Sequence, residues 1–322
     1  MNVQEFSMRF QRIRAEVARV LVGQDEVLEH TLIAIMARGH ILLEGVPGLG
    51  KTLLVRALGQ VLGCGFKRIQ FTPDLMPSDV SGSNIFNQRA DAFEFRPGPV
   101  FTQLLLADEV NRAPAKTQSA LLEAMQERSV TSDGVTRPLP LPFVVIATQN
   151  PIESQGTYPL PEAQLDRFLL KAIIRHPSQP VERQILENYL QGFDAADLVR
   201  SGLERITSDR EILEMQDALA AVRVDAGILD YITDIVGRTR NHRAIYLGAS
   251  PRASIALLHT ARARAASEGR DYVVPDDVKA LAQGVLRHRV VLHPDAEIEG
   301  ATPDECIDTI LREATVPETA AA

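Results

Sequence analysis

A glycine-rich stretch that starts at residue 45 has the composition and spacing that bind the phosphates of a nucleotide. It matches the pattern GxxxxGKT and consists of Gly45, Val46, Pro47, Gly48, Leu49, Gly50, Lys51 and Thr52. The glycines allow tight turns and bring several backbone N–H groups close to a phosphate tail. We expect Lys51 to contact the β- and γ-phosphate oxygens, Thr52 to bind Mg²⁺, and the following Leu53 to belong to the same binding segment.

The residues on either side of this loop favour a phosphate site. Residues 41–43 are a short apolar run, typical of a buried parallel strand. After the loop, Gly63 ends a run with helical spacing that consists of Leu54, Ala57, Leu58, Val61 and Leu62. Such a helix would point its positive N-terminal dipole at the phosphates. The order of strand, loop and helix favours a nucleotide site over a glycine-rich turn that fits the pattern by chance.

A second predicted strand ends in two acidic residues that could act on a bound nucleotide. Residues 104–107 are apolar, and Asp108 and Glu109 follow them. Ligands of open α/β sheets bind at the carboxyl ends of the strands, where both carboxylates would lie. Because Mg²⁺ takes few protein ligands and keeps several waters, we assign Asp108 to the metal. Glu109 would orient or deprotonate the water that attacks the γ-phosphate. The alternative is two acidic residues that merely end a strand.

The composition is that of an ordinary globular protein and disfavours several functional classes. The 322 residues are 45% hydrophobic and 24% charged, enough chain for two domains. The net charge of −8 argues against a nucleic-acid-binding protein, which usually has a basic surface. No apolar run approaches the ~18 residues of a membrane span, and the polar start of the chain is unlike a signal peptide, so we expect no membrane insertion and a cytoplasmic location. Cys64 and Cys306 are expected to be reduced, structural thiols.

The first half of the chain has the pattern of an α/β fold, a parallel sheet with helices on both faces. The expected strands cover residues 41–43, 67–71, 104–107, 143–148 and 168–174, and a helix over residues 118–126 follows Pro114. After residues 176–180 the strand signals nearly vanish. We therefore place a nucleotide-binding α/β core domain at residues 1–178 and a small, all-helical lid domain at residues 179–322.

Helix-start signals recur through the second domain. Ser208 and Glu211 form a capping box, and Pro251 and Pro275 each stand where a helix would begin.

Two inserts in the first domain look like β-hairpins. They cover residues 82–95 and 129–141, and the second has Asp133 and Gly134 at its turn. By their residues alone, the inserts are elaborations of the core that cover an edge of the sheet.

Taken in order along the chain, the motifs resemble those of an AAA+ ATPase and, more narrowly, of the MoxR family. The resemblance runs from about Val22 to about Val290. The segments that carry it are the phosphate loop, Asp108 with Glu109, and residues 22–24, 70–79, 108–114, 121–127, 147–151, 165–168 and 248–253. It implies an AAA+ core followed by the helical lid, and it implies that the two inserts contact substrates or partners, as the alternative to covering an edge of the sheet.

The resemblance also implies roles for three further residues. Asn150 matches the family's first sensor, whose amide contacts the γ-phosphate or the attacking water; the alternative is an Asn that turns a loop. Arg252 matches the second sensor, in a lid helix that would fold over the nucleotide, and the alternative is a solvated arginine. Arg167 matches the arginine that one subunit inserts into its neighbour's site. Arg112 is a rival for that role, and Asp166 with Arg167 could instead form an ion pair within the chain.

The resemblance implies an Mg²⁺-dependent ATPase whose subunits form a ring, expected to be a hexamer, with ATP at the subunit interfaces. Hydrolysis would remodel or activate a client protein, with a partner that carries a von Willebrand factor A domain. The family resemblance implies that the nucleotide is ATP, and the sequence has no guanine-reading NKxD motif. The alternatives are a chelatase-type motor that drives insertion of Mg²⁺ or Co²⁺ into a tetrapyrrole and a nucleotide-gated scaffold with little hydrolysis. A DNA helicase or transcriptional remodeller is disfavoured by the acidic charge.

Overall fold

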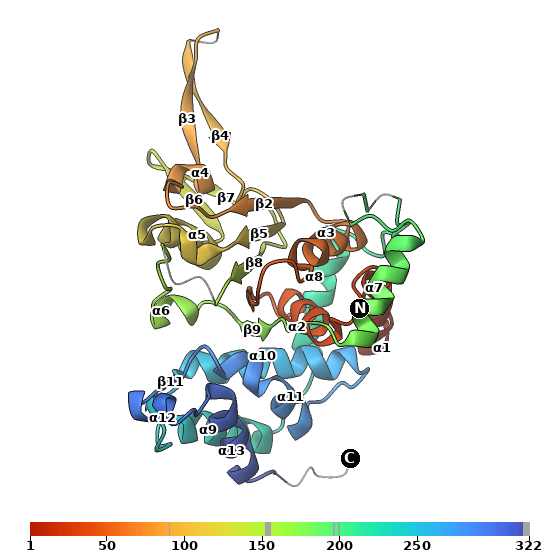
Figure 1. Cartoon of the computed structure of the whole chain (residues 1–322), viewed down its shortest axis with the longest axis vertical. Helices are drawn as coiled ribbons and strands as arrows, with labels where there is room; N and C mark the ends of the chain where they lie inside the picture. Colours follow the sequence, from red (N-terminus) through yellow and green to blue (C-terminus); the bar gives the residue numbers. More distant parts are fainter. Residues whose placement is uncertain (90, 152–155, 196, 199, 318–322) are drawn as a thin grey trace.

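A five-stranded parallel sheet forms the centre of the first domain in the computed structural model, which describes residues 1–89, 91–151, 156–195, 197–198 and 200–317 (Figure 1). The strand order is β2-β5-β8-β1-β9. The strands are β1 (Ile41–Glu44), β2 (Phe66–Gln70), β5 (Leu104–Asp108), β8 (Val144–Gln149) and β9 (Leu170–Ile173). All the strands predicted from the sequence are confirmed, with ends that differ by up to two residues.

The register of the sheet brings the ends of four strands together. Gln70 pairs with Asp108 across β2 and β5, and Glu44 pairs with Gln149 across β1 and β8. The strands are parallel, so their carboxyl ends share one edge, and the phosphate loop leaves from that edge directly after β1. This edge is where the sequence motifs must meet.

Alternate residues of the strands enter two different apolar cores. Leu43 of β1 and Leu106 of β5 belong to the larger core, while Leu42 and Leu105 belong to the smaller one. Such alternation follows from the two-residue period of a strand, and it requires a cover on each face. The prediction of helices on both faces is therefore confirmed. The helices of this domain are α1 (Val3–Ala18), α2 (Asp25–Met36), α3 (Lys51–Leu62), α4 (Pro77–Ser81), the 3-10 turn η1 (Val110–Arg112), α5 (Ala115–Glu127) and α6 (Glu162–Leu165).

The C-terminal part of the chain is helical apart from one short sheet. Its elements are α7 (Gln179–Leu190), α8 (Asp209–Ala218), the 3-10 turn η2 (Leu219–Ala221), α9 (Ala226–Thr239), β10 (Ile245–Leu247), α10 (Pro251–Ser267), α11 (Pro275–Leu286), β11 (Val291–Leu292), α12 (Pro294–Ile298) and α13 (Pro303–Glu313). The predicted helix starts at Ser208, Pro251 and Pro275 are confirmed. The antiparallel pair β10–β11 was not predicted, because strands this short carry almost no periodic signal.

The lid lies against the sheet domain rather than apart from it. Helix α10 packs on α1 and α2, and α11 packs on β9 (Figure 1). Helix α8 packs on α1 and α2 as well, and the Gln216 side chain donates to the Ile35 carbonyl at 2.7 Å. Part of the segment after residue 178 thus contacts the nucleotide-binding domain closely, and the boundary at 178 stays a prediction.

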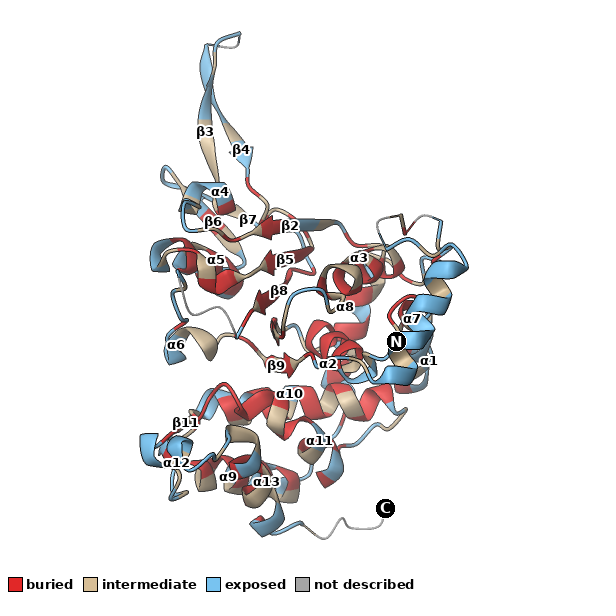
Figure 2. Ribbon diagram, in the orientation of Figure 1, coloured by how far each residue is buried: buried red, intermediate tan, exposed pale blue. Residues whose placement is uncertain are grey.

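Both predicted inserts are β-hairpins. Strands β3 (Gly82–Asn87) and β4 (Ala92–Pro97) form a long arm that projects from the sheet domain, with mostly exposed or half-buried residues (Figures 1 and 2). Strands β6 (Ser129–Ser132) and β7 (Val135–Pro138) form the second hairpin, and Asp133 and Gly134 at its turn both have positive φ. Among the residues described, no helix is long and apolar enough to cross a membrane.

Candidate active site

The phosphate loop has the backbone geometry that its glycines suggest. Gly48 and Gly50 have φ of +85° and +81°, a region that other L-residues rarely adopt. Gly45 is required for another reason, because a Cβ there would lie 2.8 Å from the Ile174 carbonyl oxygen. Helix α3 begins at Lys51, directly after Gly50, so its unpaired N–H groups and its dipole face the loop.

Lys51 is folded back onto its own loop. Its Nζ donates to the Gly45 carbonyl oxygen at 2.5 Å, and the side chain is buried. Burial lowers the pKa of Lys51, and the nearby carboxylates of Asp108, Glu109 and Glu44 oppose this shift. The lysine is therefore held among the two predicted acidic residues at the edge of the sheet.

A buried threonine of β8 joins the acidic pair. The Thr148 hydroxyl donates to Asp108 Oδ1 at 2.6 Å and accepts from the Glu109 backbone N–H at 2.8 Å. One hydroxyl thus orients both residues, as donor to one and acceptor from the other. Thr148 was not predicted as a site residue, although its place at the end of a buried strand beside Asp108 was a usable signal.

Glu109 has an unusual backbone and two side-chain partners. Its φ is +55°, in the left-handed region that costs a residue other than glycine conformational energy. Its Oε2 accepts from Gln70 Nε2 at 2.6 Å and from Arg112 NH1 at 3.0 Å. Arg112, the rival for the role of trans-acting arginine, therefore contacts the glutamate of its own chain.

Arg68 of β2 contacts the other acidic residue. Its Nε and NH2 lie 3.1 and 2.7 Å from Asp108 Oδ2, and its NH2 also donates to Gln70 Oε1 at 2.7 Å. Neither Arg68 nor Gln70 was predicted as a site residue. Their alternate positions on a strand put both on one face, but only the order of strands shows that this face borders the acidic pair.

These side chains line one cavity at the carboxyl edge of the sheet, about 480 Å³ in volume. Its walls include Pro47, Gly48, Gly50, Lys51, Thr52, Leu53, Arg68, Gln70, Asp108 and Glu109. The carboxylate of Asp108 and the hydroxyl of Thr52 are the kind of oxygen ligands that Mg²⁺ prefers, and Asp108 already holds a cation, the guanidinium of Arg68. The residues present therefore fit a magnesium ion. Within the described residues, no group of three or more His, Cys, Asp or Glu could hold a metal ion.

Two of the predicted site residues line a different cavity. Arg167 and Arg252 border a space of about 700 Å³ together with Gly39, His40 and Leu169. His40 directly precedes β1 and Leu169 directly precedes β9, so this cavity lies at the amino edge of the sheet. Neither arginine lines the cavity at the chain's own phosphate loop, which leaves from the opposite edge.

The amino-edge cavity is strongly cationic. Asp166 is the one carboxylate among the described residues that line it, and the arginines there are Arg38, Arg128, Arg167, Arg252, Arg262 and Arg289. The Arg167 NH1 donates to the Leu122 carbonyl at 2.8 Å, while Arg252 is largely exposed in the first turn of α10. A space with this balance of charge suits an anion that carries several charges.

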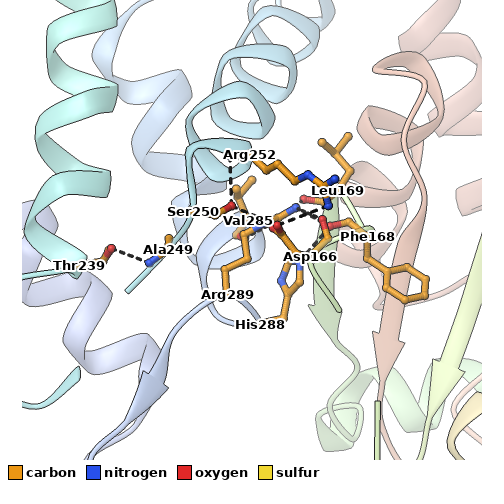
Figure 3. A network of polar contacts seen from close by, with 10 residues as sticks. All are labelled: Asp166, Phe168, Leu169, Thr239, Ala249, Ser250, Arg252, Val285, His288 and Arg289. Atoms are coloured by element: carbon orange, nitrogen blue, oxygen red, sulfur yellow. Dashed lines mark hydrogen bonds and ion pairs between the residues drawn. The ribbon is translucent and has the colours of Figure 1, made fainter. Parts of the chain in front are cut away.

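Asp166 fixes the lid rather than pairing with the arginine that follows it. Its Oδ1 accepts from the buried Arg289 Nε at 2.7 Å and its Oδ2 from the Ser250 hydroxyl at 3.1 Å, whereas Arg252 NH1 lies 3.9 Å away (Figure 3). The proposed ion pair between Asp166 and Arg167 is thus not the one that forms. Arg289 also donates to the Phe168 carbonyl at 2.7 Å, so a lid residue holds the segment just before β9 (Figure 3).

Comparison with known proteins identifies the family. Residues 40–170 match the ATPase family associated with various cellular activities (AAA), and residues 237–310 match the AAA lid domain. The chain is 45% identical to the Chaperone MoxR1 of Mycobacterium tuberculosis, over 94% of this chain and 81% of that protein. It belongs to the MoxR family of AAA+ ATPases.

Two further similarities cover nearly the whole chain of this MoxR protein. The uncharacterized protein YeaC of Bacillus subtilis is 48% identical over 94% of this chain and 92% of its own. A crystal structure of a provisionally assigned ATPase from Cytophaga hutchinsonii has a TM-score of 0.90 at 42% identity and covers 98% of this chain and 97% of that one. The resemblance inferred from the sequence motifs is therefore confirmed, as is the α/β AAA+ fold with its lid.

Asn150, the predicted first sensor of this MoxR protein, is buried directly after β8. The preceding Gln149 accepts a hydrogen bond from the Gly45 N–H at 3.2 Å, which brings the end of β8 to the first glycine of the phosphate loop. The side chain of Asn150 is not part of the wall of the 480 Å³ cavity, and its role stays a prediction.

Proposed function

We propose that this MoxR protein hydrolyses Mg²⁺-bound ATP in the cavity at the carboxyl edge of the sheet. The loop backbone and Lys51 would bind the phosphates, while Thr52 and Asp108 would hold the metal. Glu109 would orient the attacking water or take its proton, and Asn150 would help to position that water. Bound magnesium would supply positive charge against the charge that develops on the phosphoryl oxygens.

We further propose that Arg167 and Arg252 act on the nucleotide of a neighbouring subunit in a ring, which the family resemblance suggests is a hexamer. The observation that carries this is the placement of both arginines at the amino edge, away from the phosphate loop of their own chain. A head-to-tail arrangement would bring the cationic cavity of one subunit to the phosphate site of the next. A guanidinium suits the charge spread over a transferring phosphoryl group.

Mixing two inactive variants tests this arrangement. Glu109→Gln cannot activate the attacking water but keeps its arginines. Arg167→Ala keeps both carboxylates of the acidic pair but lacks the Arg167 guanidinium. If the arginine acts between subunits, an equimolar mixture should recover ATPase activity, up to about a quarter of the wild-type rate for random assembly of a closed ring. The control is each variant alone at the same total concentration. Activity no higher than that of the separate variants would show that Arg167 acts within its own chain.

The work done by hydrolysis would be remodelling or activation of a client protein, as a chaperone does. The name of the 45%-identical Chaperone MoxR1 supports this choice. The von Willebrand factor A partner rests on the family resemblance, and client contact by the two hairpins remains a proposal. The chelatase-type alternative predicts a large tetrapyrrole-binding partner, and affinity capture with Glu109→Gln in ATP distinguishes it from a protein client. The scaffold alternative predicts assembly with negligible turnover.

A further inference from the structure

The two carboxylates of the site are both held by residues of one edge strand. Arg68 and Gln70 flank the buried Ile69 on β2, so their side chains lie on the same face. Arg68 contacts Asp108 Oδ2, Gln70 contacts Glu109 Oε2, and Arg68 also donates to Gln70 Oε1. The four side chains form one continuous chain of polar contacts.

We propose that Arg68 is the resident counter-ion of the metal-binding carboxylate, and that Mg²⁺ must displace it. The inference rests on the proposed assignment of Asp108 to magnesium. In the absence of nucleotide, Arg68 neutralises Asp108 and, through Gln70, restrains Glu109. When the metal binds the Asp108 carboxylate, the Arg68 guanidinium moves away from it. The Gln70 amide then loses the hydrogen bond that orients it.

Competition follows from the contacts of Asp108. Its Oδ1 is taken by the Thr148 hydroxyl, and Oδ2 is the oxygen that the guanidinium approaches with two of its nitrogens. A metal bound through that oxygen or its water shell would stand within a few ångströms of a positive charge, which is unfavourable at the edge of a protein. Mg²⁺ and Arg68 therefore exclude each other.

The Arg68 side chain is also accessible to solvent. Its side chain is 46% exposed, against 15% for Asp108, so packing does not lock the guanidinium in place. The orientation of the Gln70 amide depends on Arg68. The hydrogen bond from Arg68 to Gln70 Oε1 sets the direction of the amide and so directs Nε2 towards Glu109. Loading of the metal and loss of the Gln70 restraint on Glu109 would thus be coupled through Arg68, while Arg112 stays in contact with Glu109.

The test is a magnesium titration of nucleotide binding, with a fluorescent, non-hydrolysable ATP analogue and Arg68→Gln. Loss of the competing cation should lower the Mg²⁺ concentration at which the tightening of nucleotide binding is half-maximal. We expect a decrease of about two- to fivefold, the range of a partly exposed ion pair. Lys67→Gln is the matched control, since it removes the same charge from the opposite face of the strand and should leave this concentration unchanged. Arg68→Lys keeps a charge without the guanidinium fork and should give a smaller decrease.

Two results would overturn the proposal. An unchanged magnesium requirement in Arg68→Gln, with or without a lower melting temperature, would make Arg68 a structural residue. If Arg68→Gln binds the analogue more weakly than the wild-type protein in EDTA, but its magnesium titration is unchanged, Arg68 is a phosphate ligand. If the wild-type protein itself shows no effect of magnesium on binding, the proposed function fails instead, so the two failures are distinguishable.

Discussion

At the scale of single residues, the site depends on a few hydrogen bonds that set the direction of charged groups. Thr148 orients Asp108 and the Glu109 backbone at once, and Glu109 keeps a left-handed φ of +55°. Residues other than glycine hold such a conformation only where the surroundings enforce it, and active sites are a common place for this. The carboxylate of Glu109 is thereby turned towards Gln70 and the cavity rather than continuing along the strand.

The first prediction concerns this carboxylate. Glu109→Gln keeps the size and shape of the side chain but cannot accept a proton from water. We expect nucleotide binding to be retained and ATP hydrolysis to fall by at least about a hundredfold, the usual contribution of a positioned general base. Steady-state phosphate release and binding of a fluorescent nucleotide measure the two effects. Turnover close to the wild-type rate would assign activation of the water to another group.

At the scale of elements, a buried histidine joins three of them at the amino edge. His40 precedes β1, its Nδ1 accepts from the Val145 N–H of β8 at 3.0 Å, and its Nε2 lies 3.1 Å from the Met125 carbonyl of α5. Only a neutral ring with its proton on Nε2 satisfies both contacts. Burial is the main cause that lowers the pKa of His40 to about 4, with a smaller contribution from Arg128.

The second prediction is a loss of stability in acid. Above pH 6.5 the ring is neutral in both the folded and the unfolded chain, so the full stability is present. As the pH falls from 6.5 to about 4, the unfolded chain binds a proton that the folded chain does not, and stability decreases by about 3 kcal/mol from this group. Burial lowers the pKa of His30 and His288 as well, and both act in the same direction.

Urea denaturation at a series of pH values measures this loss. In His40→Gln, the free energy of unfolding should depend less steeply on pH between 6.5 and 4, whatever the absolute stability of the variant. His176→Gln, which removes an exposed histidine, should keep the wild-type slope. Identical slopes for all three proteins would show that His40 does not titrate differently on folding.

At the scale of the whole molecule, one carboxylate connects the lid to the sheet domain. Asp166 faces Arg289, whose side chain is only 3% exposed and which also donates to the Phe168 and Leu169 carbonyls. Burial lowers the pKa of Arg289, and Asp166 opposes this shift by stabilising the charge. This ion pair beside the cationic cavity thus helps to hold the lid against the sheet domain, together with the packing of α10 on α1 and α2.

The third prediction separates lid docking from chemistry. Asp166→Ala leaves a buried guanidinium without its carboxylate and should lower the free energy of unfolding by about 3 kcal/mol. Arg252→Ala is the control, because Arg252 is 60% exposed and lies 3.9 Å from Asp166, and its loss should change stability by less than about 0.5 kcal/mol. Chemical denaturation measures both. Equal stability of Asp166→Ala and the wild-type protein would mean that the backbone carbonyls alone hold Arg289.

Arg252 should matter for turnover instead. Since it lines the cationic cavity beside Arg167, Arg252→Ala should lower ATPase activity while leaving the folded state intact, whereas Asp166→Ala is expected to lower stability. The two variants together test whether the amino-edge cavity has a role in hydrolysis as well as in lid docking.

Local sequence patterns were sufficient to predict several parts of the fold and of the site. Apolar runs gave the buried strands, the glycines and Lys51 gave the phosphate loop, and Asp108 with Glu109 followed a predicted strand, because each feature is complete within a few neighbouring residues. The tertiary structure alone decided which residues meet. Strand order brings Arg68 and Gln70 of β2 to the acidic pair, and chain direction puts Arg167 and Arg252 at the opposite edge from Lys51. Contacts between residues far apart in sequence depend on how the elements pack, and neither spacing nor periodicity records that arrangement.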